Sequence, residues 1–251
     1  MWWTIIMEGF LMINEYSTLL YMRITDCCNV KCPFCLAYSS PRNNNYMSFT
    51  NFQNIVAKYH NLGDYAIQLE GGEPLLHPEF LKMVKHCCAD PRCRIIRIAT
   101  NAILLNEVVR SLALLAASYK KIIFVKISIN YFLEETIQDR LNILETLLKP
   151  YVNSEFLKFK WSIYLRHPKE LDSFFLNELN SSVILSQFPR YVGNLVFCGR
   201  GLENKVSNLT VEPRCWKSPD LRLIFITPDG QEFEDDKEFN SYSRNLADDP
   251  L

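Results

Sequence analysis

The chain alternates short runs rich in β-branched and aromatic residues with longer segments of helical periodicity, and this alternation constrains its fold more than any other feature. We expect strands at 21–25, 65–69, 94–99, 122–129 and 155–165, and a last strand at either 183–185 or 194–197. We expect helices between them at 47–62, 78–88, 106–119, 134–148 and 168–179. Strands that are apolar throughout are typical of a parallel sheet covered by helices.

Five or six β/α units between residues 20 and 200 are too few for a closed eight-stranded barrel. The pattern therefore indicates an α/β fold, either a partial barrel or an open doubly wound sheet. We predict a partial (β/α)6 TIM-like barrel over residues 20–200 with a short C-terminal extension over residues 201–251. In either architecture the chemistry takes place at the carboxyl ends of the strands.

Three cysteines, Cys28, Cys32 and Cys35, follow the first predicted strand at spacings of four and three residues. Soft thiolate ligands select iron–sulfur clusters or zinc. Three thiolates fit three corners of a cubane cluster and leave its fourth iron open to a small molecule that carries an amine and a carboxylate. The spacing alone leaves two alternatives, which are zinc with a fourth ligand elsewhere and cysteines that are simply buried.

Charge and cysteine usage exclude several classes of protein. Lys and Arg number 27 against 28 Asp and Glu, so no global basic field indicates DNA, a large RNA or an anionic membrane as a partner. The first 22 residues contain no basic side chain, and no run approaches the roughly 20 apolar residues of a membrane-spanning helix. We expect a soluble cytoplasmic protein, in which nine cysteines do not form a disulfide framework.

Two motifs follow consecutive predicted strands. Cys28-x-x-x-Cys32-x-x-Cys35, with the aromatic Phe34 before its last cysteine, is followed about 35 residues later by Gly71-Gly72-Glu73-Pro74. In this order the two motifs resemble those of the radical S-adenosylmethionine (radical SAM) enzymes, and the resemblance covers roughly residues 21–201.

The resemblance implies that the three cysteines hold one [4Fe-4S] cluster and that S-adenosyl-L-methionine binds its fourth iron. It further implies reductive cleavage of this cofactor to a 5′-deoxyadenosyl radical, which abstracts hydrogen from a substrate. The residues expected at the cofactor or in the substrate cleft are Phe34, Gly71, Gly72, Glu73, Pro74, Thr100, Asn101, Ser128, Asn130 and Arg166.

Five of these residues have assigned roles under the resemblance. The Gly-Gly-Glu turn is expected to contact the amino group of the cofactor, because glycines let backbone carbonyls approach closely and Glu73 adds charge. Ser128 is expected to bond the ribose hydroxyls, and Arg166 to pair with the methionyl carboxylate. Solvent-exposed or capping roles remain alternatives for Thr100, Asn101, Ser128, Asn130 and Arg166.

The C-terminal region resembles the start of the cysteine-rich SPASM extension or its shorter relative, twitch. The resemblance lies in Cys215-Trp216 and in the segment 221–230. Because Asp235 stands where a further cysteine is expected and no cysteine follows Cys215, we predict a degenerate extension and a single cluster. Cys198 is predicted to be either a hydrogen-atom donor near the cleft or a packed residue.

The predicted substrate is a peptide or a small natural product, modified by epimerisation, dehydrogenation or cross-linking. Modification of a sugar, a nucleoside or a tRNA is the alternative, and a non-catalytic zinc or iron–sulfur binding protein is a second alternative. The resemblance also implies an oxidoreductase-type reaction with a one-electron reductant such as flavodoxin or ferredoxin.

Overall fold

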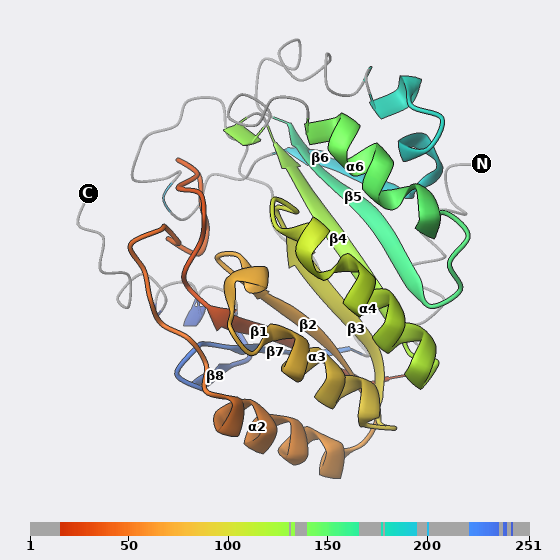
Figure 1. The fold of residues 1–251 in the computed structure, drawn as a ribbon. Helices are drawn as coiled ribbons and strands as arrows, with labels where there is room; N and C mark the ends of the chain where they lie inside the picture. Colours follow the sequence, from red (N-terminus) through yellow and green to blue (C-terminus); the bar gives the residue numbers. More distant parts are fainter. Residues whose placement is uncertain are drawn as a thin grey trace.

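The computed structural model describes residues 16–130, 132–133, 140–165, 177, 179–194, 200, 221–235, 238–239 and 242. Within these residues one eight-stranded sheet has the order β6-β5-β4-β3-β2-β1-β7-β8 (Figure 1). The strands are β1 (Thr18–Thr25), β2 (Tyr65–Gly71), β3 (Cys93–Thr100), β4 (Ile122–Asn130), β5 (Leu157–Leu165), β6 (Arg190–Asn194), β7 (Arg222–Ile226) and β8 (Glu232–Phe233). All neighbouring strands are parallel except β7 and β8.

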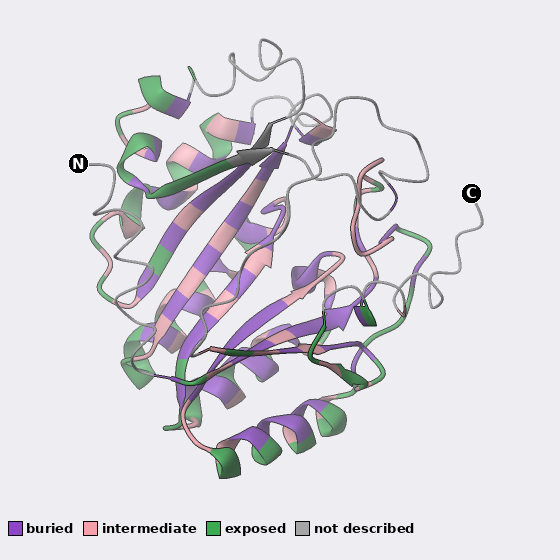
Figure 2. Ribbon diagram, turned by 180° about the vertical axis from the view of Figure 1, so that it is seen from behind, coloured by how far each residue is buried: buried purple, intermediate pink, exposed green. Residues whose placement is uncertain are grey.

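The helices lie together on one face of this sheet, as Figure 1 shows. They are α2 (Phe49–Leu62), α3 (Phe80–Ala89), α4 (Leu105–Tyr119) and α6 (Arg140–Leu148), with short 3-10 turns at η2 (Pro74–Leu76), η3 (Lys149–Tyr151) and η5 (Leu185–Gln187). The opposite face of the strands is seen in Figure 2. The predicted α/β class is confirmed as a mostly parallel, open sheet, and none of the described helices is long and apolar enough to cross a membrane.

Helix α2 has the N-cap and the buried apolar face that the helical periodicity of its sequence predicted. Ser48 caps its start by accepting a hydrogen bond of 3.2 Å from the Asn51 backbone N–H. The predicted apolar face is buried against the sheet at Phe52, Val56 and neighbouring positions. The five strands predicted from residue 21 to residue 165 are confirmed with small shifts at their ends.

The last barrel strand was predicted at 183–185 or 194–197, and the strand in the structure meets the second position only at Asn194, since residues 195–197 lie outside the described residues. Strand β6 occupies Arg190–Asn194. Val183 is 75% exposed, and Leu185 begins the turn η5. Among the described residues β6 pairs only with β5, and its Tyr191 and Val192 are exposed, so it lacks the continuous apolar run of a strand that is buried on both faces. The search for an apolar run therefore missed most of it. Most of the helix predicted at 168–179 lies outside the described residues.

The prediction of strands that are apolar throughout is wrong for β4, where buried and half-buried residues alternate. Ile123, Val125 and Ile127 are fully buried. Lys126 and Ser128 alternate with them and so point to the opposite face of the sheet. The face of β4 away from these buried residues is therefore partly polar.

Part of the predicted C-terminal extension belongs to the same sheet. Strand β7 pairs in parallel with β1, from Thr18 opposite Arg222 to Met22 opposite Ile226. Ile224 and Ile226 join the main hydrophobic core. Residues 201–220, which include Cys215, lie outside the described residues, so the likeness to a SPASM or twitch extension stays a prediction.

Candidate functional site

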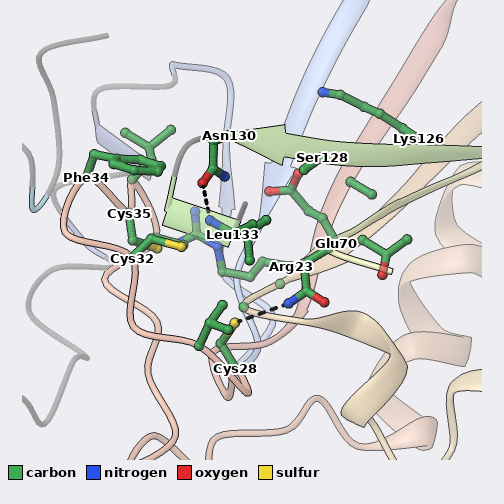
Figure 3. Close-up of a pocket in the computed structure, with 18 of the residues that line it drawn as sticks. Arg23, Cys28, Cys32, Phe34, Cys35, Glu70, Lys126, Ser128, Asn130 and Leu133 are labelled. Carbon is green, nitrogen blue, oxygen red and sulfur yellow. Dashed lines mark hydrogen bonds between the residues drawn. The ribbon is translucent and has the colours of Figure 1, made fainter. Parts of the chain in front are cut away.

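A cavity of about 250 Å³ lies at the carboxyl ends of the strands, and the side chains of Cys28, Cys32 and Cys35 all line it (Figure 3). Seven further residues predicted for the cofactor or cleft also line it: Phe34, Gly71, Gly72, Thr100, Asn101, Ser128 and Asn130. Cys198 and Arg166 lie outside the described residues. The structure therefore brings together most of the predicted site residues that it describes.

Cys28 and Cys32 lie in an environment that disfavours bare thiolates. Burial raises the pKa of Cys28 well above its ordinary value, and burial with the nearby Cys35 raises the pKa of Cys32 to about 12. A cationic metal centre would reverse this by stabilising the thiolates. The donor chemistry thus fits an iron–sulfur centre.

The spacing of the thiols bears on which metal centre fits. Among the described His, Cys, Asp and Glu side chains, no three converge as they would on a single ion. A cubane cluster binds each thiolate through a different iron and so does not require that convergence. The three sulfurs around one cavity are compatible with such a cluster.

Arg200 holds the loop that carries the three cysteines through hydrogen bonds to its backbone. This role was not predicted from the sequence. Its Nη1 donates to the carbonyl oxygen of Cys32 at 2.9 Å, and its Nη2 donates to those of Tyr38 at 2.7 Å and Ser39 at 3.1 Å. Its backbone N–H donates to Cys35 at 3.0 Å. The arginine is 5% exposed. The only available signal was an arginine between the two glycines that follow Cys198.

The Gly-Gly turn after β2 holds the other end of the loop. The backbone N–H groups of Gly72 and Glu73 donate to the carbonyl oxygens of Thr25 and Cys27, each at 2.9 Å. A Cβ atom at Gly71 would overlap the Thr25 carbonyl oxygen, and one at Gly72 would overlap that of Cys27. Glycine is required here because two backbone segments touch, in addition to any approach of a ligand.

Glu73 and Pro74 are buried and do not line the cavity, unlike the two glycines before them. The Glu73 carboxylate accepts hydrogen bonds from Thr100 Oγ1 at 2.7 Å, Asn101 N at 2.8 Å and Leu75 N at 3.2 Å. Burial raises its pKa to about 7, against the effect of these hydrogen bonds. In the structure Glu73 positions the end of β3.

Two asparagines complete the wall of the cavity. Asn101 Nδ2 donates to Asn29 Oδ1 at 2.7 Å and lies 4.0 Å from the Cys28 sulfur. Asn130 Oδ1 accepts a hydrogen bond of 3.1 Å from the backbone N–H of Leu133. Asn101 thus links the end of β3 to the first cysteine.

Two buried arginines near the thiols were also missed. Arg140 has no hydrogen-bond partner for any of its three guanidinium nitrogens within the part of the chain that the structure describes. Burial lowers its pKa to about 10, and the charges of Glu73 and Cys32 oppose that shift. Arg23 lines the cavity from β1. A basic residue inside an apolar strand was the signal for Arg23, whereas nothing local marked Arg140.

Comparisons with known proteins agree with the geometry. A family model of the radical SAM superfamily matches residues 22–151. The GTP 3′,8-cyclase of Chlorobaculum tepidum is 33% identical over 92 residues, covering 36% of this chain and 28% of that protein. The GTP 3′,8-cyclase of Shewanella denitrificans is 29% identical over 84 residues, covering 33% and 25%. The chain thus spans about a quarter of the length of these relatives.

Solved structures with a similar fold have low sequence identity. SuiB of Streptococcus suis bound to S-adenosylmethionine is 12% identical, with a TM-score of 0.46 over 91% of this chain and 63% of that one. Native anSMEcpe with bound AdoMet and the Cp18Cys peptide is 16% identical, with a TM-score of 0.50 over 71% and 51%. At 16% identity the likeness to anSMEcpe concerns the fold alone.

Proposed function

The chain belongs to the radical SAM superfamily, and from that premise we propose that Cys28, Cys32 and Cys35 hold one [4Fe-4S] cluster that works with S-adenosyl-L-methionine on an organic substrate. The observation that carries the proposal is that all three thiols line one cavity at the carboxyl ends of parallel strands. When bound, the cluster supplies the electron that cleaves the cofactor to a radical able to take hydrogen from an unactivated carbon.

The residues of the cavity wall have distinct proposed roles. Backbone carbonyls of Gly71 and Gly72 accept from the cofactor's amine, and Ser128 accepts from its ribose hydroxyls. Phe34, Thr100, Asn101 and Asn130 shape the remaining wall and limit the access of water. The position of each residue on the cavity wall supports these roles.

Arg140 does not itself line the cavity, but it is a buried cation close to Cys32, and we propose it for the cofactor's methionyl carboxylate. Its guanidinium is buried with three nitrogens that lack partners among the described residues, and it lies within electrostatic reach of Cys32. A carboxylate would satisfy these donors through charge-assisted hydrogen bonds. Arg166, the residue predicted for this role, and Cys198, the predicted hydrogen-atom donor, remain proposals outside the described residues.

For the substrate we propose a peptide or a small natural product, on the basis of the SPASM-like pattern from Cys215 to Gly230. The matches to GTP 3′,8-cyclases over about a third of the chain favour a second candidate, a nucleoside or nucleotide. A flavodoxin or ferredoxin as reductant and a cytoplasmic location belong to the same proposal.

Anaerobic reconstitution with iron and sulfide tests the central proposal. We expect a brown protein with about four irons per chain, which forms 5′-deoxyadenosine when S-adenosyl-L-methionine and dithionite are added. Cys32→Ala should abolish both cluster assembly and 5′-deoxyadenosine. Cys88→Ala is the matched control, since Cys88 is a buried thiol of α3 away from the cavity.

Two outcomes would overturn the proposal. One is a colourless protein that binds zinc and forms no 5′-deoxyadenosine, which would establish the non-catalytic alternative. The other is cofactor cleavage by Cys32→Ala at the wild-type rate, which would remove this cysteine from the ligand set. Mass spectrometry after anaerobic turnover with a peptide mixture or a nucleotide mixture then separates the two substrate classes.

A further inference from the structure

Arg23 is a buried cation that faces the cavity with unsatisfied donors. It is 2% exposed, and its Nε and Nη1 have no hydrogen-bond partner among the residues that the structure describes. Figure 3 shows its guanidinium projecting toward the thiols of Cys32 and Cys35. Because buried charged donors without partners are unfavourable, such a group calls for an anionic ligand.

The surroundings of Arg23 occupy one face of the guanidinium but leave N–H groups open. The ring of Phe239 lies 4.3 Å from its Cζ and makes a cation–π contact. Burial lowers the pKa of Arg23, and the charge of Glu70, opposite it on β2, opposes that shift. Glu70 accepts no hydrogen bond from Nε or Nη1, so these two donors remain available.

The residues that line the cavity come from two regions, and Arg23 arises from the strands while its guanidinium extends toward the cysteine loop (Figure 3). The first is the loop region, with the three cysteines and the Gly-Gly turn. The second is the strand region, formed by Tyr21 and Arg23 on β1, Glu70 on β2 and Lys126 on β4. With the cluster and cofactor assigned to the loop region, the strand region is left for the substrate.

We propose that Arg23 binds an oxyanion of the substrate, a carboxylate or a phosphate, and thereby orients the substrate in the strand region of the cavity. This inference rests on the proposed function. A guanidinium suits such a group because its planar donors form charge-assisted hydrogen bonds. Lys126 adds a second positive charge to the same wall. A substrate analogue without the oxyanion would leave the buried donors of Arg23 unpaired and would therefore bind more weakly.

The test uses the full chain after anaerobic reconstitution, with acetate and methylphosphonate as probes. Both carry a methyl group, so saturation-transfer NMR measures the binding of each without turnover. We expect the wild type to bind at least one probe, and Arg23→Met to weaken that binding by about tenfold or more, the loss expected for a charge-assisted hydrogen bond. The probe that binds more tightly identifies the carboxylate or the phosphate.

Two further variants serve as controls. Arg110→Met removes one positive charge from an exposed position of α4 and should leave probe binding unchanged. Arg23→Lys keeps the charge but loses the planar donors, and we expect it to bind the probe with intermediate affinity. It also keeps the test usable when Arg23→Met fails to fold.

The proposal is overturned when neither probe binds the wild type, or when Arg23→Met binds as well as the wild type. It is also overturned when Arg23→Met loses the change that S-adenosyl-L-methionine produces in the EPR spectrum of the reduced cluster, because Arg23 would then serve the cofactor. Failure of the proposed function has a separate signature, since the wild type would form no 5′-deoxyadenosine whatever Arg23 binds.

Discussion

Arg200 donates a hydrogen bond of 2.9 Å to the carbonyl oxygen of Cys32, a residue 168 positions earlier in the chain. Two more bonds from the same guanidinium reach Tyr38 and Ser39. The loop that carries the proposed ligands is therefore held from outside by a residue that follows the last barrel strand. Its shape does not depend on its own sequence alone.

Arg200→Met should loosen this loop. The substitution leaves carbonyl oxygens without donors in a buried setting, and we expect the free energy of unfolding to fall by about 2–3 kcal/mol. We also expect the reconstituted protein to lose iron to a chelator faster than the wild type. Urea unfolding and the rate of bleaching measure the two effects. Equal bleaching rates would show that Arg200 has no positioning role.

Gly72→Ala should disturb the loop from its other end. The new Cβ would lie 2.7 Å from the carbonyl carbon of Cys27, so the contact between the two segments must open. We expect a loss of about 1–3 kcal/mol together with lower iron content. Gly63→Ala is the control, because a Cβ there meets nothing within 4 Å and only the backbone at φ +139° is strained. Normal iron content in Gly72→Ala would contradict the prediction.

Arg140→Met should weaken the binding of S-adenosyl-L-methionine without destabilising the fold. Removing a buried guanidinium without partners among the described residues should leave the free energy of unfolding of the cofactor-free protein unchanged or raise it. Affinity for S-adenosyl-L-methionine should fall about tenfold or more through the loss of a charge-assisted bond. Anaerobic calorimetry and urea unfolding measure the pair. Lower stability with unchanged affinity would make Arg140 a structural residue.

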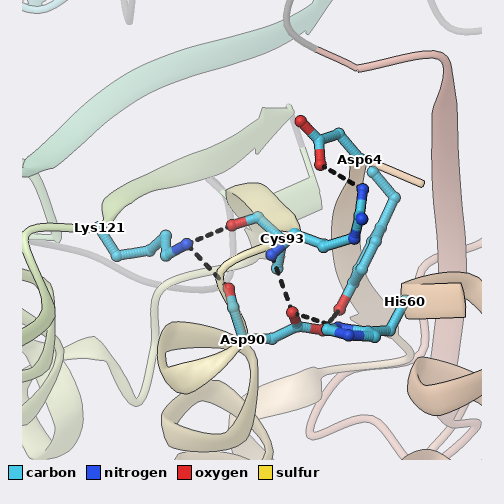
Figure 4. A network of polar contacts seen from close by, with 7 residues as sticks. His60, Asp64, Asp90, Cys93 and Lys121 are labelled. Carbon is cyan, nitrogen blue, oxygen red and sulfur yellow. Dashed lines mark hydrogen bonds and ion pairs between the residues drawn. The ribbon is translucent and has the colours of Figure 1, made fainter.

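Asp90→Asn should lower stability without affecting the cavity, because Asp90 lies at the opposite end of the strands. Its carboxylate accepts bonds of 2.6 Å from Tyr65, 2.8 Å from His60 and 2.9 Å from the Arg92 backbone. Lys121 donates to the carbonyl oxygens of Asp90 and Cys93 in the same network (Figure 4). We expect a loss of about 2 kcal/mol near neutral pH.

The effect of Asp90 should depend on pH. Burial raises the pKa of Asp90, but hydrogen bonds from Tyr65, Arg92 and His60 outweigh burial and hold the pKa below its ordinary value. A carboxylate with a lowered folded-state pKa stabilises above its unfolded pKa of about 4, and that contribution disappears as the pH falls through the folded value. Urea unfolding of the wild type and Asp90→Asn should show that the difference between their free energies of unfolding shrinks as the pH falls from about 7 to about 3. A constant difference would refute this.

Lys120→Gly should stabilise the protein. Lys120 ends α4 in the left-handed conformation, at φ 49° and ψ 41°, and its side chain is exposed. Glycine adopts this conformation without strain, so we expect a gain of about 0.5–1 kcal/mol. Lys120→Ala keeps the Cβ atom and should change little. A thermal melt of the two variants checks the prediction, and equal melting temperatures would count against it.

Local patterns predicted the elements and the thiol cluster because both depend on residues close in sequence. The spacing of Cys28, Cys32 and Cys35 placed three sulfurs on one loop, and the alternation of strands and helices placed that loop at the carboxyl ends of parallel strands. Most of strand β6 was missed because Tyr191 and Val192 are exposed and the strand has no continuous apolar run.

The sequence by itself determined the succession of strands and helices along the chain and the grouping of the three cysteine sulfurs on one loop, since periodicity and short spacings act within a few residues. Only the tertiary structure decided that Glu73 turns away to hold the end of β3, that β7 joins the sheet beside β1, and that Arg23 is buried with open donors in the cavity. Burial and hydrogen-bond partnership are set by which distant segments meet.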